Sequence, residues 1–189
     1  MRNHILSILA SFTIISIAAL PASAQEGTIE RVDNRPFYAS LDGEVTIDAP
    51  AHIVWEALMA VDNYAEWNPA ILDVQPTGSD LAAVGERFSI RLPRWWGHKD
   101  QWVKVQVARA PNGEEPGEWV YNHDDFASRI NWLGVQRIHH VEQVGEGQTL
   151  FQITEVYTGA TWTAAVNYTK GVLETFLERL KQRAETLVK

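Results

Sequence analysis

Residues 45–71 read VTIDAPAHIVWEALMAVDNYAEWNPAI, and this stretch decides the fold because its pattern changes from alternating to helical within a few residues. Val45 and Ile47 share one face of a predicted strand over residues 38–48. Pro50 suits the first turn of a helix, since its φ angle is fixed and a missing N–H costs nothing there. The stretch therefore predicts a strand that leads directly into a helix.

Two tryptophans mark the short helices that follow this strand. Trp55 lies in the first helix, and a second helix is predicted from Asp62 to Trp67. The second helix ends there because Pro69 restricts the backbone of the residue before it. Each tryptophan either fills the core or closes one end of an internal cavity. Core packing is the favoured interpretation for Trp55, and both alternatives stay open for Trp67.

The middle of the chain alternates with a period of two, which is typical of strands. The predicted strands are 71–76, 86–92, 101–110, 117–122, 130–143 and 148–157. Short turn-rich segments separate them, so antiparallel pairing of successive strands is expected. Gly145 and Gly147 are predicted to form the last hairpin, and residues 93–100 are predicted to form a loop.

The last part of the chain has a helical period from about residue 163 to residue 187. Val172, Phe176 and Leu180 recur at steps of four on one side, and charged residues occupy the other side. A strand, two short helices, a meander of strands and one long helix indicate an α+β fold. A curved sheet wrapped around such a helix tends to leave a cavity between the two, and such cavities are mostly apolar with a few polar groups.

The first 24 residues have the pattern of a cleavable signal peptide. A basic start is followed by an uncharged run of 16 residues from Ile5 to Leu20, and small residues then precede a cleavage site expected after Ala24. A retained membrane anchor is the alternative, but roughly 20 apolar residues are needed to span a bilayer. We therefore expect a periplasmic or secreted protein with a flexible leader over residues 25–37 and a single domain over residues 38–189.

Composition excludes several classes of function. The chain has no cysteine, so disulfides, thiolate catalysis and thiolate metal sites are absent. Its formal charge is −8, and no basic stripe appears, so nucleic-acid binding is not expected. The histidines do not follow the spacing of a metal site, and the segment NHDDF at 122–126 is better explained as a turn, so neither a metal nor a cofactor is expected.

These residues resemble the START-like (SRPBCC) superfamily. The resemblance starts with Val54-Trp55 and continues with Tyr64-Ala-Glu-Trp67-Asn68-Pro69. It ends with a segment whose matching positions are Trp132, Gly134, Gly147, Thr149, Phe151, Glu155, Tyr157 and Gly159. The resemblance implies a helix-grip fold, in which a curved antiparallel sheet wraps around the long C-terminal helix and two short helices close one end.

Three polar residues are candidates for ligand contact or catalysis. Glu155 alternates with Phe151 and Tyr157 on the apolar face of its strand, where a carboxylate must be paired or have a raised pKa. Arg137 is its expected partner, and the same parity places His139 beside it, although Ile138 argues for the opposite register. Superfamily members often have His at the position of Arg137, so this chain departs from them there. A structural ion pair between two strands is the alternative to a ligand site.

Other residues are expected around the cavity that the resemblance implies. The full set of expected ligand-binding residues is Trp67, Phe88, Trp132, Arg137, His139, Phe151, Glu155, Tyr157 and Tyr168. Trp95 and Trp96, in the predicted loop, are expected to form a lid, to make transient membrane contact or to pack on the core.

The leading interpretation is an exported protein that holds an apolar or amphipathic small molecule, such as a lipid, a sterol or isoprenoid, or a polyketide-like compound. The alternative is a cofactor-independent cyclase, dehydratase or isomerase that uses Glu155 or His139 as a general acid or base. A third interpretation is an interaction protein whose cavity is filled by its own side chains.

Overall fold

The computed structural model describes residues 27–35, 37–78, 80–94, 97–124, 133–159 and 163–189. Within them, eight antiparallel strands form one sheet in the order β1-β2-β8-β7-β6-β5-β4-β3. The strands are β1 (Thr28–Arg35), β2 (Tyr38–Ile47), β3 (Asp73–Pro76), β4 (Arg87–Arg94), β5 (Gly97–Arg109), β6 (Gly117–His123), β7 (Leu133–Gly145) and β8 (Gln148–Gly159).

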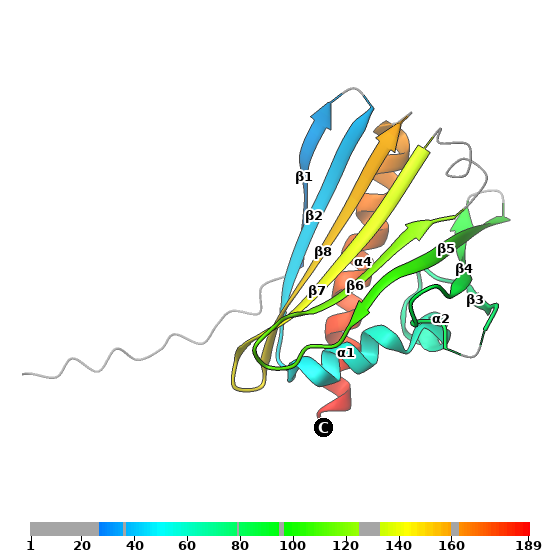
Figure 1. The fold of residues 1–189 in the computed structure, drawn as a ribbon. Coiled ribbons are helices and arrows are strands. Elements are labelled where there is room, and N and C mark those ends of the chain that lie inside the picture. Colours follow the sequence, from blue (N-terminus) through cyan, green and yellow to red (C-terminus); the bar gives the residue numbers. More distant parts are fainter. Residues whose placement is uncertain (1–26, 36, 79, 95–96, 125–132, 160–162) are drawn as a thin grey trace, which may run out of the picture.

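In the described part of the chain, three helices and one helical turn accompany the sheet. They are α1 (Ala51–Met59), the 3-10 turn η1 (Val61–Asn63), α2 (Tyr64–Trp67) and the long α4 (Thr163–Leu187). Figure 1 shows α4 running along one face of the curved sheet, with α1 and α2 near the end at which α4 finishes. The helix-grip arrangement expected from the sequence is confirmed.

The core lies between α4 and the inner face of the sheet. The side of α4 that faces the sheet buries Leu173, Leu177, Leu180 and Ala184. Each fully buried leucine contributes about 1.5–3 kcal/mol relative to an exposed one. Among the described residues, no helix is both long enough and apolar enough to cross a membrane.

The N-terminal edge of the sheet differs from the prediction of a flexible leader over residues 25–37. Thr28–Arg35 pairs with β2 as an antiparallel strand, with a register shift between Arg31 and Asp33. Ile29 is buried in the core, and a side chain at Gly43 would meet it. The sequence of this strand, TIERVDNR, has two apolar residues, Ile29 and Val32, spaced three apart among polar and charged ones, and this weak strand pattern explains why the sequence suggested a leader.

The segment predicted as a loop over residues 93–100 is also corrected. β4 continues to Arg94 and β5 begins at Gly97, and these two residues pair with each other. Pro93 ends the period-two pattern in the sequence, but the strand continues through it and pairs with β5 alone at this point. Trp95 and Trp96 lie outside the described residues, so the prediction that they form a lid remains a prediction.

The hairpin between β7 and β8 sets the register of the residues expected to matter most. Gly145 pairs with Gln148, and Gly147 has a φ of 68°, a conformation that favours glycine. The predicted hairpin is therefore confirmed. Its register places Arg137 directly opposite Glu155.

Candidate functional site

The inner face of the sheet contains several polar side chains in an otherwise apolar surface. Val135 and Val141 are buried in the core, and Arg137 and His139 lie between them with the same parity, whereas Ile138 points to the other face. The two registers left open by the sequence are thereby decided in favour of Arg137 and His139 facing inward.

Arg137 and Glu155 form a buried ion pair across β7 and β8. Nε of Arg137 donates to Oε2 of Glu155 at 2.5 Å, and Nη2 contacts the same oxygen. The side chains are 12% and 1% exposed, respectively. Pairing of this kind is the usual condition for a charge to remain buried, because desolvation of either group alone is costly.

Two tyrosines extend this pair into a network. Nη1 of Arg137 donates to the hydroxyl of Tyr121 at 2.8 Å, and the hydroxyl of Tyr157 donates to Oε1 of Glu155 at 2.5 Å. Thr169 on α4 hydrogen-bonds to Tyr157 in turn. The network thus joins β6, β7, β8 and α4, and both carboxylate oxygens of Glu155 accept hydrogen bonds within it.

The charges and hydrogen bonds of the network fix the protonation of its members. Burial alone would lower the pKa of Arg137, but the carboxylate of Glu155 raises it further above its already high value, so the guanidinium stays charged. Burial raises the pKa of Tyr157, and the adjacent Glu155 carboxylate raises it again. Tyr157 therefore remains a neutral hydrogen-bond donor.

His139 lies in an aromatic enclosure and is 1% exposed. Its ring centroid is 5.1 Å from that of Trp119, 5.5 Å from that of Tyr121 and 5.9 Å from that of Phe151. Burial, followed by the positive charge of Arg137, lowers the pKa of His139 to about 3, so the ring is neutral. Nδ1 lies 3.1 Å from the carbonyl oxygen of Trp119. Because a carbonyl only accepts, Nδ1 is the protonated nitrogen.

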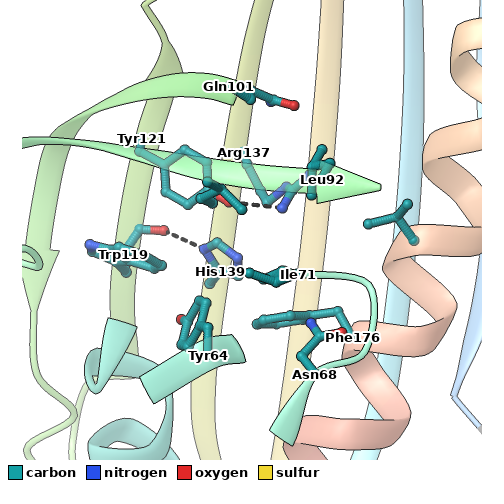
Figure 2. A pocket seen from close by; sticks show the side chains of 12 residues that line it. Tyr64, Asn68, Ile71, Leu92, Gln101, Trp119, Tyr121, Arg137, His139 and Phe176 are labelled. Atoms are coloured by element: carbon teal, nitrogen blue, oxygen red, sulfur yellow. Dashed lines mark hydrogen bonds between the residues drawn. The ribbon is translucent and has the colours of Figure 1, made fainter. Parts of the chain in front are cut away.

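A small cavity lies beside this enclosure, between the sheet, α4 and the segment after α2. The centre of a water molecule can move within a volume of about 30 Å³ inside it. Figure 2 shows Tyr121 and Arg137 above His139, with Tyr64, Asn68 and Phe176 below it. The lining residues are Tyr64, Asn68, Ile71, Ile90, Leu92, Gln101, Trp119, Tyr121, Arg137, His139, Val172 and Phe176.

The residues predicted to line the cavity fall into two groups. Arg137 and His139 line it directly. The second group lies outside the lining, where Phe88 and Phe151 pack in the core and Glu155 and Tyr157 support Arg137. Trp132 lies outside the described residues.

The two remaining aromatic candidates lie near the cavity but do not line it. Trp67 is half-buried and packs edge-on against Tyr64, with ring centroids 5.0 Å apart. Tyr168 is placed differently from the prediction, because it faces outward on α4, is about half exposed, and donates to the carbonyl oxygen of Pro93 at 2.9 Å. Trp55 packs against the core, as favoured from the sequence, and approaches Gly117 closely.

Ten of the twelve lining residues were not among the predicted site residues, and Asn68, Gln101, Trp119 and Tyr121 are four of them. The parity of the predicted strand 117–122 places Trp119 and Tyr121 on one face, and this signal was available. Gln101 required the exact register of β5, and Asn68 required the conformation of the chain between α2 and β3.

Outside the enclosure, His123 and Asp124 each contact another side chain. Nδ1 of His123 lies 2.8 Å from the side-chain nitrogen of Gln101, and burial lowers the pKa of His123 well below its usual value. Asp124 makes an ion pair with Arg87 at 2.6 Å. Within the described part of the chain, no group of three or more His, Asp or Glu side chains is arranged to hold a metal ion.

A larger hollow opens on the surface, away from the network. Its volume is about 420 Å³, and its lining comes from the end of α1, η1 and the residues around β3. It contains Asp62 and Asp80 but none of the residues expected to bind a ligand. The buried cavity is therefore the better candidate site.

Solved structures similar to this one share its fold at low sequence identity. Norcoclaurine synthase from Thalictrum flavum, solved as a point mutant with a transition-state analogue, has a TM-score of 0.62 and 11% identity over 83% of this chain and 100% of that chain. A START superfamily protein from Mycobacterium smegmatis has a TM-score of 0.60 and 14% identity over 78% and 98%. The Zhui aromatase/cyclase from a Streptomyces species has a TM-score of 0.60 and 15% identity over 80% and 96%.

The sequence itself identifies the family. No curated protein matches the chain. Residues 38–185 match the family model described as polyketide cyclase / dehydrase and lipid transport. This match covers most of the chain and agrees with the resemblance seen in its motifs. The protein therefore belongs to the polyketide cyclase / dehydrase and lipid transport family, within the START-like superfamily.

Proposed function

We propose that the protein binds an apolar or amphipathic small molecule between the sheet and α4, with the polar end of the ligand at Arg137. The observation that supports this most strongly is the buried Arg137–Glu155 pair at the edge of a cavity with mostly apolar walls. If the ion pair only joined two strands, there would be no reason for the guanidinium of Arg137 to line a cavity. Sites of this composition, apolar with a few fixed polar groups, are typical of small-molecule binding.

The ligand enters by separating elements that are in contact in this structure. A cavity of about 30 Å³ has room for one or two water molecules, whereas ligand pockets typically have about 300–1,000 Å³. The hydroxyl of Tyr168 on α4 is bonded to Pro93 on β4, so it holds the helix against this hairpin. Movement of α4 away from β4 and β5 is therefore the opening that we propose.

The class of ligand follows from the lining. Lipid, sterol, isoprenoid and polyketide-like molecules all bury apolar surface, which contributes about 25 cal/mol per Å² before the costs of ordering. Arg137 supplies the charged donor, and Glu155 holds it in place without contacting the ligand.

Catalysis by a general base is less well supported. Both oxygens of Glu155 already accept hydrogen bonds. A pKa of about 3 makes His139 a weak base near neutral pH. A cyclase, dehydratase or isomerase would therefore have to use these groups in another arrangement.

Export is part of the same proposal, and the pattern of residues 1–24 supports it. Contact with a membrane through Trp95 and Trp96 is proposed as the route by which an apolar ligand is collected.

Native mass spectrometry of the mature protein from its own exported fraction tests the proposal. A discrete copurifying apolar molecule, identified after organic extraction, is the expected result. Absence of the mature protein from that fraction argues against export. A protein that neither copurifies with a molecule nor takes one up from lipid or terpenoid extracts argues against the carrier function.

A further inference from the structure

The side chain of Asn68 has a hydrogen-bond donor without a partner in the described structure. Asn68 is 1% exposed, and its Oδ1 accepts the backbone N–H of Ala70 at 3.0 Å. The side-chain amide of Asn68 can accept this N–H only through its oxygen, so Oδ1 must face Ala70 and the orientation of the amide group is fixed. Nδ2 is buried with no partner among the described residues, and the residue lines the cavity. An unpaired buried donor is unfavourable, so this N–H group requires an acceptor in the cavity.

His139 offers the complementary group at the same cavity. Its Nδ1–H is directed to the carbonyl of Trp119, so Nε2 has a free lone pair and acts as an acceptor. No described residue is hydrogen-bonded to Nε2. Figure 2 shows the ring of His139 between Trp119 and Ile71, in the middle of the lining.

The other polar groups near this point are already used or are directed elsewhere. The hydroxyl of Tyr64 donates to the carbonyl of Leu58 at 2.5 Å. The indole nitrogen of Trp119 also has no described partner, but Figure 2 shows it on the side of the ring away from His139. Tyr121 accepts from Arg137, so its own proton is available as a second donor to the cavity.

The geometry points to a hydroxyl-binding subsite formed by Asn68 and His139, separate from the Arg137–Glu155 pair. A hydroxyl accepts from Nδ2 of Asn68 and donates to Nε2 of His139. A carboxylate or an ether has no proton for Nε2, and an ammonium has no lone pair for Asn68. A water molecule has the same chemistry, and the cavity volume of about 30 Å³ accommodates it.

The subsite takes the hydroxyl of the ligand or, before the ligand binds, a water molecule. The ligand part of this inference rests on the proposed function, whereas the water part does not. The two are therefore tested separately, first with the protein alone and then with matched probes.

Nitrogen-15 NMR of the histidine ring tests the subsite in the protein alone. We expect His139 to be protonated at Nδ1 and its Nε2 to have the shift of a hydrogen-bonded acceptor. Oxygen-17 relaxation dispersion should count one fewer long-lived water in His139→Asn, which retains a donor for Trp119 but has no acceptor at the position of Nε2. His52→Asn, on the exposed side of α1, is the control and should leave the count unchanged. Protonation of His139 at Nε2 in the wild-type protein overturns the inference.

Two probes with the same ten-carbon chain test the choice of ligand: 1-decanol and decyl methyl ether. Tryptophan fluorescence titrations should give at least tenfold tighter binding of decanol than of the ether. The preference should fall below about threefold in His139→Asn and in Asn68→Ser, and His139→Gln, with an amide oxygen near the position of Nε2, should recover part of it. Equal binding of decanol and the ether by the wild-type protein overturns the inference, as does an unchanged preference in His139→Asn.

Failure of the proposed function gives a different result. If neither probe binds while the tautomer and the water are as expected, the carrier function is refuted and the subsite stands as a water site.

Discussion

At the scale of single residues, the Arg137–Glu155 pair stays charged in the core only because each partner compensates the other. Tyr121 and Tyr157 then satisfy the remaining hydrogen bonds around the pair. Loss of one charge leaves the other buried without compensation, and this costs far more than the net stabilisation that the intact pair provides. Variants at this site therefore have to be chosen in pairs.

Replacement of Glu155 by Gln is expected to destabilise the protein by about 3–5 kcal/mol, because the charge of Arg137 remains buried. The double variant Arg137→Met/Glu155→Met should recover most of this loss, and urea unfolding of both measures it. A single variant as stable as the wild-type protein would show that the pair is solvated. A loss of activity in Glu155→Gln alone would therefore not identify a general base.

The buried histidine makes the protein sensitive to acid. The pKa of His139 is about 3 in the folded state and about 6.5 when unfolded, so the unfolded chain binds more protons between these values. Stability is therefore complete above pH 6.5 and falls as the pH decreases. His139 alone should remove about 2 kcal/mol between pH 7 and pH 5.

Urea unfolding at both pH values tests this expectation. His139→Asn should lose less stability between pH 7 and pH 5 than the wild-type protein. His123, whose pKa burial also lowers, contributes in the same direction, so His123→Asn should reduce the loss independently. An equal loss in all three proteins would mean that neither ring is buried in its neutral form.

The sequence predicts part of this site and not the rest. Alternation in residues 148–157 is enough to place Glu155 on a buried face, and a tight hairpin then brings Arg137 opposite to it. Asn68 cannot be found in this way, because its donor reaches the cavity through the irregular chain after α2. The residues between α2 and β3 follow neither the helical period nor the period of two that is typical of strands.

At the scale of elements, β1 is held by its pairing with β2 and by the packing of Ile29, which lies close to Gly43. A Cβ atom built on Gly43 would lie 2.0 Å from Cδ1 of Ile29 and 3.1 Å from the carbonyl oxygen of Thr28. The glycine therefore provides the space in which Ile29 packs.

Gly43→Ala is expected to cost about 1–3 kcal/mol, because overpacking displaces Ile29. Amide hydrogen exchange should lose protection in β1 while β7 and β8 retain it. The cost should be smaller in an Ile29→Ala background, since the displaced side chain is then absent. Equal costs in both backgrounds would place the clash elsewhere.

Elements with a strong pattern were predicted better than elements at the edges. The amphipathic period of 163–187 reproduces α4 because a helix against a sheet requires one apolar side. β1 and the ends of β4 and β5 were missed, since pairing with a neighbouring strand holds them in place despite charged residues and a proline. The alternation of apolar and polar residues within one segment does not reveal its pairing with another strand.

At the scale of the whole molecule, the proposed ligand can bind only after α4 has moved away from β4 and β5. The observed rate of association should level off as the ligand concentration rises, because opening becomes limiting. Stopped-flow fluorescence with 1-decanol measures this plateau. Tyr168→Phe removes the hydrogen bond to Pro93 and should raise the plateau roughly two- to tenfold.

Tyr38→Phe is the matched control for this experiment, because its hydroxyl does not contact Pro93. It should leave the plateau unchanged. A rate that rises linearly with ligand concentration would mean that the cavity is already open.

The architecture was predictable as a whole, but the size of the cavity was not. The order of strands and helices, together with the START-like motifs, indicates a sheet around a helix. Cavity volume depends on how Trp119, Phe176 and Ile71 pack, which is a property of side-chain contacts rather than of pattern.

The pairing of β2 with β8 has a consequence for the order in which the molecule is assembled. Tyr38 lies opposite Thr158, so two segments more than a hundred residues apart must meet before the sheet is continuous. Contacts between such distant segments slow folding, because the intervening loop must be closed before the contact stabilises anything. As the chain is synthesised, β2 emerges more than a hundred residues before β8, its partner on one side. The export that we propose would benefit from this delay, because a chain that has not finished folding can still pass through a translocation channel.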